Sequence, residues 1–170
     1  MTKPDFFDES LGAWRYVRQG LISEVDNIPE GQFDFRPTPD VKSVRELVRH
    51  ILEGSMMMAG ELTRDEPNFQ RMPFEALMEE YAAKARAAQG KRELLDLLES
   101  QLEDGTTQFK AVGEDAMMGP VTNFDGGTWS RMQWFFHGMT EEMYHRGQLT
   151  TYARLMGLVP ALTQQIMGSG

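Results

Sequence analysis

Residues 141–149 read Glu-Glu-Met-Tyr-His-Arg-Gly-Gln-Leu and lie inside a helical pattern that begins at residue 128 or 130 and ends at residue 155. At about 100° per residue, Glu141 and His145 fall on the same, otherwise apolar, face of this helix. Ionisable groups on an apolar face are costly unless something compensates them. The pattern therefore predicts that both side chains point into a helical bundle or into a pocket in its wall.

Three further stretches show the three-to-four-residue spacing of apolar side chains that is typical of amphipathic helices. They cover residues 6–28, 43–62 and 73–102. The second begins with Ser-Val-Arg-Glu at residues 43–46, a pattern in which the serine and the glutamate cap the helix. Gly90 indicates a bend in the third. The sequence thus predicts an all-α fold, a four-helix bundle.

The segment between the third and fourth helices, residues 105–127, is rich in glycine. We predict one long irregular loop here, with short strands at most, and connections of this length are often functional. We expect this loop and the first linker, residues 33–40, to decide substrate choice. Because no repeat or domain boundary is visible, residues 1–167 are predicted to form a single domain and residues 168–170 a disordered tail.

Charge and composition argue against several classes of partner. The chain has 170 residues, and 17 Lys and Arg against 26 Asp and Glu give it a net charge of −9. This balance argues against nucleic acid and against an anionic membrane surface. The chain has no cysteine, which excludes disulfides, thiolate metal ligands and a cysteine nucleophile. With no signal-peptide pattern at its start, we expect a cytoplasmic protein that acts on a small molecule.

A third metal ligand must come from another helix, because the chain has only three histidines. His50 lies on the second predicted helix, at the margin of its apolar stripe. His137 precedes His145 by two turns, or about 11 Å, whereas zinc–nitrogen bonds are about 2.0–2.1 Å long. The more economical set is therefore His50, Glu141 and His145, with His137 lining the pocket beside it.

Two imidazoles and one carboxylate bind catalytic zinc or non-haem iron and leave positions open for water or substrate. Such a metal would activate either water for hydrolysis or a thiol for transfer. Because the chain has no cysteine, that thiol must come from a cofactor or a substrate. His137 and Tyr152 are candidates for proton transfer or substrate positioning.

Two metal-free alternatives stay open. In the first, Glu141 pairs with Arg49 or Arg146, and the protein is a non-catalytic bundle that binds a small apolar or thiol ligand or acts as a stress-associated dimer. In the second, the protein is a purely structural partner, which predicts a large exposed apolar face.

The stretch His-Arg-Gly-Gln-Leu at residues 145–149, late in a long last helix, resembles the DinB/YfiT-like family. Two further stretches match the family: Phe-Arg-Pro-Thr-Pro at residues 35–39, before the helix that carries His50, and Leu-Met-Gly at residues 155–157. The resemblance covers nearly the whole chain. It implies a four-helix bundle that holds a divalent metal, often nickel or zinc, with three histidines.

In this resemblance, His50 matches the ligand on the second helix and His145 matches the second ligand on the last helix. The remaining family histidine falls on position 141, where this chain has glutamate. A carboxylate admits iron or manganese as well as zinc or nickel, so the site can persist with another metal preference. Characterised relatives imply a hydrolase, an isomerase or a thiol transferase that uses a low-molecular-weight thiol, and they imply a homodimer.

Overall fold

A computed structural model describes residues 5–168 of the chain. Its helices are α1 (Phe6–Asn27), α2 (Val44–Leu62), α3 (Phe74–Ala87), α4 (Lys91–Met117), α5 (Arg131–Leu155) and α6 (Ala161–Gly168), with a 3-10 turn η1 (Glu30–Gln32). The strands β1 (Pro120–Thr122) and β2 (Thr128–Ser130) form an antiparallel hairpin. Within the predicted disordered tail, Gly168 ends α6, and residues 169 and 170 lie outside the described residues.

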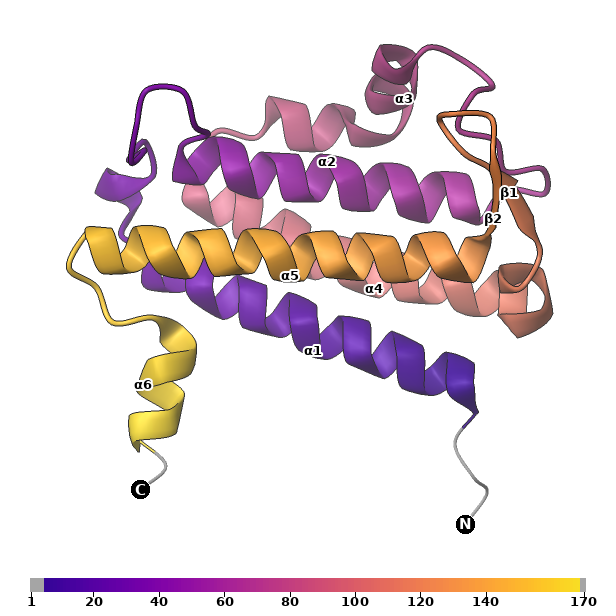
Figure 1. The fold of residues 1–170 in the computed structure, drawn as a ribbon. Coiled ribbons are helices and arrows are strands. Elements are labelled where there is room, and N and C mark those ends of the chain that lie inside the picture. Colours follow the sequence, from indigo (N-terminus) through magenta and orange to yellow (C-terminus); the bar gives the residue numbers. More distant parts are fainter. Residues whose placement is uncertain (1–4, 169–170) are drawn as a thin grey trace.

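Four helices, α1, α2, α4 and α5, form the bundle (Figure 1). Both α1 and α2 pack against α4 and α5, so α1 and α2 lie diagonally opposite each other. Helix α3 covers the outer side of α2, and α6 packs on α1 (Figure 1). The predicted all-α four-helix bundle is confirmed.

Side-chain caps start the helices at the places that the sequence predicts. At α2, the Ser43 hydroxyl accepts a hydrogen bond from the backbone N–H of Glu46, and the Glu46 carboxylate accepts one from the N–H of Ser43, which completes the capping box. At α5, the Ser130 hydroxyl accepts from the N–H of Gln133 at 3.1 Å. Each cap satisfies backbone donors that have no partner inside the helix.

The predicted helix over residues 73–102 is in fact two helices, α3 and α4, separated by residues 88–90. Ala88 is extended, and Gly90 is the residue before α4. The guanidinium of Arg49 on α2 donates to the carbonyl of Ala88 at 2.8 Å and so holds the break against the bundle. The prediction placed the irregularity correctly at Gly90, but the helix is broken there and not merely bent.

The irregular connection is shorter than predicted, because α4 continues to Met117. Gly105 is a packing residue here: a Cβ at this position would lie 2.8 Å from the Trp14 ring on α1. Gly113 interrupts the helical geometry with a φ of 79°. Only residues 118–130 remain between α4 and α5, and they contain the short β1–β2 hairpin.

Two apolar clusters fill the bundle along its length. The cluster nearer the hairpin includes Trp14, Met57 and Phe135, and the other includes Leu21 and Leu98. Within residues 5–168, none of the helices combines the length and the apolar character that crossing a bilayer requires.

Candidate functional site

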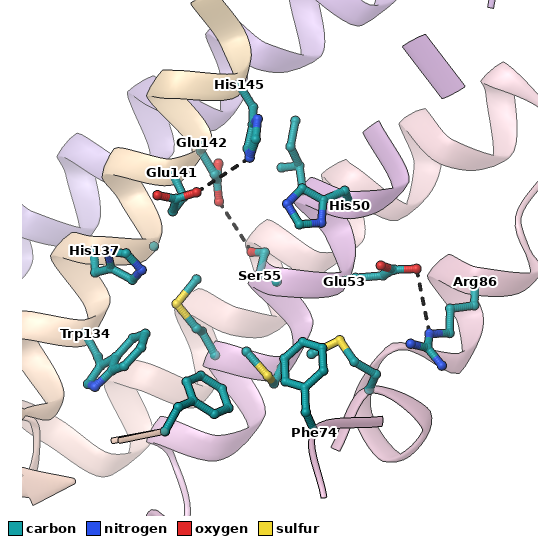
Figure 2. Close-up of a pocket in the computed structure, with 17 residues that line it drawn as sticks. His50, Glu53, Ser55, Phe74, Arg86, Trp134, His137, Glu141, Glu142 and His145 are labelled. Carbon is teal, nitrogen blue, oxygen red and sulfur yellow. Dashed lines mark hydrogen bonds and ion pairs between the residues drawn. The ribbon is translucent and has the colours of Figure 1, made fainter. Parts of the chain in front are cut away.

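A cavity of about 340 Å³ lies between α2, α3 and α5, beside the β1–β2 turn. Its polar lining comes from three helices and includes His50 and Glu53 on α2, Arg86 on α3, and His137, Glu141 and His145 on α5. Its apolar lining includes Met57, Met58, Phe74, Met78, Phe124 and Trp134. In Figure 2, His50, Glu141 and His145 gather at one end, and Phe74 and Trp134 lie at the other. Four of the five predicted site residues therefore share one cavity.

His145 presents one free ring nitrogen at the polar end. The side chain is 12% exposed, and its Nδ1 lies 2.8 Å from Oε1 of Gln148, one turn further along α5. Because an amide oxygen only accepts, this contact requires the proton on Nδ1. In the neutral ring the lone pair is then on Nε2, which is buried and has no hydrogen-bond partner within residues 5–168. This is the state in which histidine binds metals.

His50 faces His145 from α2. The two ring centroids are 5.0 Å apart, and the rings are nearly perpendicular. Burial lowers the pKa of His50, Lys42 and His145 act in the same direction, and Glu141 opposes them. His50 is therefore neutral at pH 7, and it too has a lone pair available for a metal.

Glu141 lies at the mouth of the cavity, where its side chain is 49% exposed. Its Oε2 is 3.6 Å from Nε2 of His145, which is too far for a hydrogen bond. In residues 5–168, no three His, Asp or Glu side chains are already close enough together to hold a metal ion. The chemistry of the set fits a divalent metal nevertheless, because two imidazoles, one with a buried ring nitrogen that has no partner within residues 5–168, and a carboxylate border the same space.

The structure separates the two residues predicted to transfer protons. His137 lines the cavity and packs edge-on against Trp134, with ring centroids 4.9 Å apart. Tyr152 does not reach the cavity: it packs against Phe35, and its hydroxyl donates to the carbonyl of Lys42 at 3.1 Å. Tyr152 shares the helix face of His145 but lies about two turns further along, so its place does not support the predicted role.

A buried ion pair that the sequence did not predict contributes one carboxylate, that of Glu142, to the lining of the cavity. Arg18 on α1 is fully buried, and its Nε and Nη2 donate to the two carboxylate oxygens of Glu142 at 2.9 and 2.6 Å. Its other donors bond to Ser55 on α2 and to Leu98 and Gln101 on α4. All five guanidinium N–H groups are thus used, and one arginine connects all four helices of the bundle.

The sequence contained a signal for this pair. Arg18 interrupts the apolar stripe of the first helix between Val17 and Leu21, and a charged residue there needs a buried partner. Glu142 and Ser55 both line the cavity, and Glu142 is the neighbour of Glu141. The pair therefore fixes α5 against the other helices at the turn that carries Glu141.

Solved structures with the same fold are known. YfiT from Bacillus subtilis, described as a probable metal-dependent hydrolase with an unusual four-helix bundle topology, is 16% identical, with a TM-score of 0.71 and 93% of each chain covered. A DinB-like protein of Bacillus subtilis, YjoA, is 19% identical, with a TM-score of 0.67 over 88% of this chain and 92% of its own.

A mycothiol-dependent maleylpyruvate isomerase is 16% identical, with a TM-score of 0.68 over 84% of this chain but only 60% of its own length. At these identities the likeness shows the fold alone. No protein of curated function matches the sequence. The sequence model of the DinB family matches residues 1–167. With a match over nearly its whole length, the chain belongs to the DinB family.

Proposed function

We propose that this protein is a divalent-metal-dependent enzyme in which His50, Glu141 and His145 hold the metal at the polar end of the cavity. The observation that carries the proposal is the state of His145. Its Nδ1 is held by Gln148, while its Nε2 is buried and has no partner within residues 5–168. A buried polar atom without a partner costs about 1–3 kcal/mol, and a metal at the cavity would satisfy it.

Hydrolysis is the reaction that this arrangement supports best. A divalent metal bound there supplies an acidified water and polarises the bond to be cleaved. His137 lines the same cavity, and its ring has no hydrogen bond within residues 5–168, so it is free to take a proton from water or give one to the leaving group. The largely apolar remainder of the cavity binds the body of a small substrate and excludes bulk water.

Thiol transfer is the second candidate. Three methionines, Met57, Met58 and Met78, line the cavity, and their polarisable thioethers suit a sulfur-containing ligand. The chain has no cysteine, so the thiol would be an exogenous low-molecular-weight compound. Its sulfur would lie at the polar end, where a metal held by the same three residues would stabilise a thiolate as it would an activated water. Both reactions thus require the same three side chains.

The donor set decides which metals we expect. Two nitrogens and one oxygen suit zinc and nickel, and the carboxylate of Glu141 makes iron or manganese alternatives.

Metal analysis of the untagged protein tests the proposal. We expect stoichiometric divalent metal in the wild type, its loss in His145→Ala and its retention in His137→Ala, which removes an imidazole from the same cavity but not from the ligand set. Elemental analysis by mass spectrometry measures all three. A metal-free wild type of full stability would instead support a non-catalytic bundle that binds a small apolar or thiol ligand.

Gln148 is expected to prepare His145 for the metal. Gln148→Leu removes the acceptor at Nδ1 and should weaken metal binding about 10–100-fold, as the loss of such supporting contacts usually does. Gln148→Glu should retain or strengthen binding. Gln133→Leu, at an exposed position of the same helix, is the matched control. Isothermal titration gives the affinities, and equal values for Gln148→Leu and Gln133→Leu would contradict this role.

We also propose a cytoplasmic homodimer. Large apolar side chains, Tyr16 on α1 and Met143 and Tyr144 on α5, are exposed on helices that pack side by side. Light scattering should give a mass about twice the 19.4 kDa of one chain. A mass of one chain would contradict the dimer.

The cytoplasmic location is tested by fluorescence microscopy of the tagged protein.

A further inference from the structure

Glu53 is a cavity-lining carboxylate to which no group within residues 5–168 donates a hydrogen bond. It lies on α2, one turn after His50, and its side chain is only 21% exposed. Its partner is Arg86, whose Nε is 3.7 Å from Oε1, beyond hydrogen-bond length. Carboxylates removed from water normally accept several hydrogen bonds. Glu53 is therefore prepared to accept hydrogen bonds from a ligand.

Arg86 is a poor receptor for an anion, although it also lines the cavity. Its Nη1 donates to Glu75 and lies 3.8 Å from Glu79, while its Nε faces Glu53. Three carboxylates thus share one positive charge. An incoming anion would compete with all three, whereas a cation would relieve their repulsion.

The end of the cavity opposite His50, Glu141 and His145 is lined by aromatic rings. Phe74 begins α3, Phe124 lies in the β1–β2 turn and Trp134 is on α5. The Phe124 ring centroid lies 5.7 Å from that of Phe74 and 5.8 Å from that of Trp134, at interplanar angles of 65° and 79°. Rings in this arrangement bind an apolar body and also favour a nearby cation.

From these three features we infer that the cavity selects an amine, that is, a small molecule with a protonated amino group and an apolar or aromatic body. The amino group donates to Glu53, and the body packs against Phe74, Phe124 and Trp134. Because residues three apart on a helix have Cβ atoms about 5–6 Å apart, a group bound at Glu53 lies beside His50. The inference names the substrate class of the proposed enzyme and rests on that function for its chemistry.

Three probes of similar size and different charge test the inference: phenethylamine, phenethyl alcohol and 3-phenylpropanoate. Isothermal titration into chelator-treated protein and into metal-loaded protein gives the dissociation constants. We expect phenethylamine to bind about tenfold more tightly than the alcohol, which corresponds to one charge-assisted hydrogen bond. The carboxylate should bind most weakly in the metal-free protein, where only the protein's own charges act.

Two variants locate the effect. Glu53→Gln should remove the advantage of phenethylamine and leave the affinity for phenethyl alcohol unchanged. Glu79→Gln is the matched control, because Glu79 is as far from Arg86 as Glu53 is but does not line the cavity. This control should keep the preference for the amine.

Three outcomes in the metal-free wild-type protein would overturn the inference: no saturable binding of the amine, equal binding of amine and alcohol, or tightest binding of the carboxylate, which would make Arg86 the anchor. The metal-free measurement keeps this test separate from the proposed function. A protein that prefers the amine but never binds metal contradicts the metal-dependent enzyme alone, and one that binds metal but not the amine contradicts the substrate class alone.

Discussion

Replacing Arg18 with methionine is expected to destabilise the protein by about 3–5 kcal/mol, because the change leaves a buried carboxylate without its counter-charge. Glu142 is 4% exposed and would keep only the indole N–H of Trp14 and a 3.4 Å contact with Ser55. Gln101 and the carbonyl of Leu98 would each lose one donor as well, although the Ser55 hydroxyl also donates to Gln101. Urea denaturation followed by circular dichroism measures the loss.

The double variant Arg18→Met/Glu142→Leu should recover most of that stability. Removing both charges also removes the cost of burying them, and such replacements are often neutral or stabilising. Arg15→Met is the matched control on the same helix: Arg15 pairs with exposed Glu103 at the surface, so its loss should cost no more than about 1 kcal/mol. Equal losses in Arg15→Met and Arg18→Met would show that the buried pair is not the connection between the four helices.

Local sequence patterns were sufficient to predict the bundle helices and the residues at which α2 and α5 begin. The apolar stripes and the caps at Ser43 and Ser130 each depend on residues within a few positions of one another. The end of α4 could not be predicted in this way, because Gly105 resembles a loop residue until Trp14 is placed against it. Long-range contact likewise starts α6, where the buried carboxylate of Glu24 accepts hydrogen bonds from two backbone N–H groups of that helix.

In the candidate site, too, local patterns predicted some residues, and others depend on long-range packing. Helical periodicity was sufficient to bring His137, Glu141 and His145 to one cavity, and His50 lies where the second helix faces them. Helical periodicity predicts which face of a helix a residue lies on, but not how far a cavity extends along that face. Tyr152 lies on the predicted face but beyond the end of the cavity, which the sequence could not show. The pairing of Glu53 with Arg86 depends on how α3 lies on α2, which no local pattern contains.

Under the proposed function, zinc should raise the thermal unfolding midpoint of the wild-type protein by about 8–16 °C at a free concentration of 1,000 times its dissociation constant. At that ratio a ligand adds about 4 kcal/mol to the free energy of unfolding, and 1 kcal/mol shifts the midpoint of a domain of this size by about 2–4 °C. Differential scanning calorimetry with and without a chelator measures the shift. His137→Ala should show the full shift.

Alanine variants of the three ligands should reduce this shift unequally. The Nδ1 of His145 is held by Gln148 and its Nε2 is buried, so this side chain loses the least hydration and conformational freedom when it binds the metal. His145→Ala should therefore abolish the shift. Glu141 is half exposed and must lose hydration and side-chain freedom to reach the metal, so Glu141→Ala should retain part of it. His50→Ala should fall between the two. A loss in Glu141→Ala as large as in His145→Ala would contradict this order, and an unchanged shift in all three would place the ligands elsewhere.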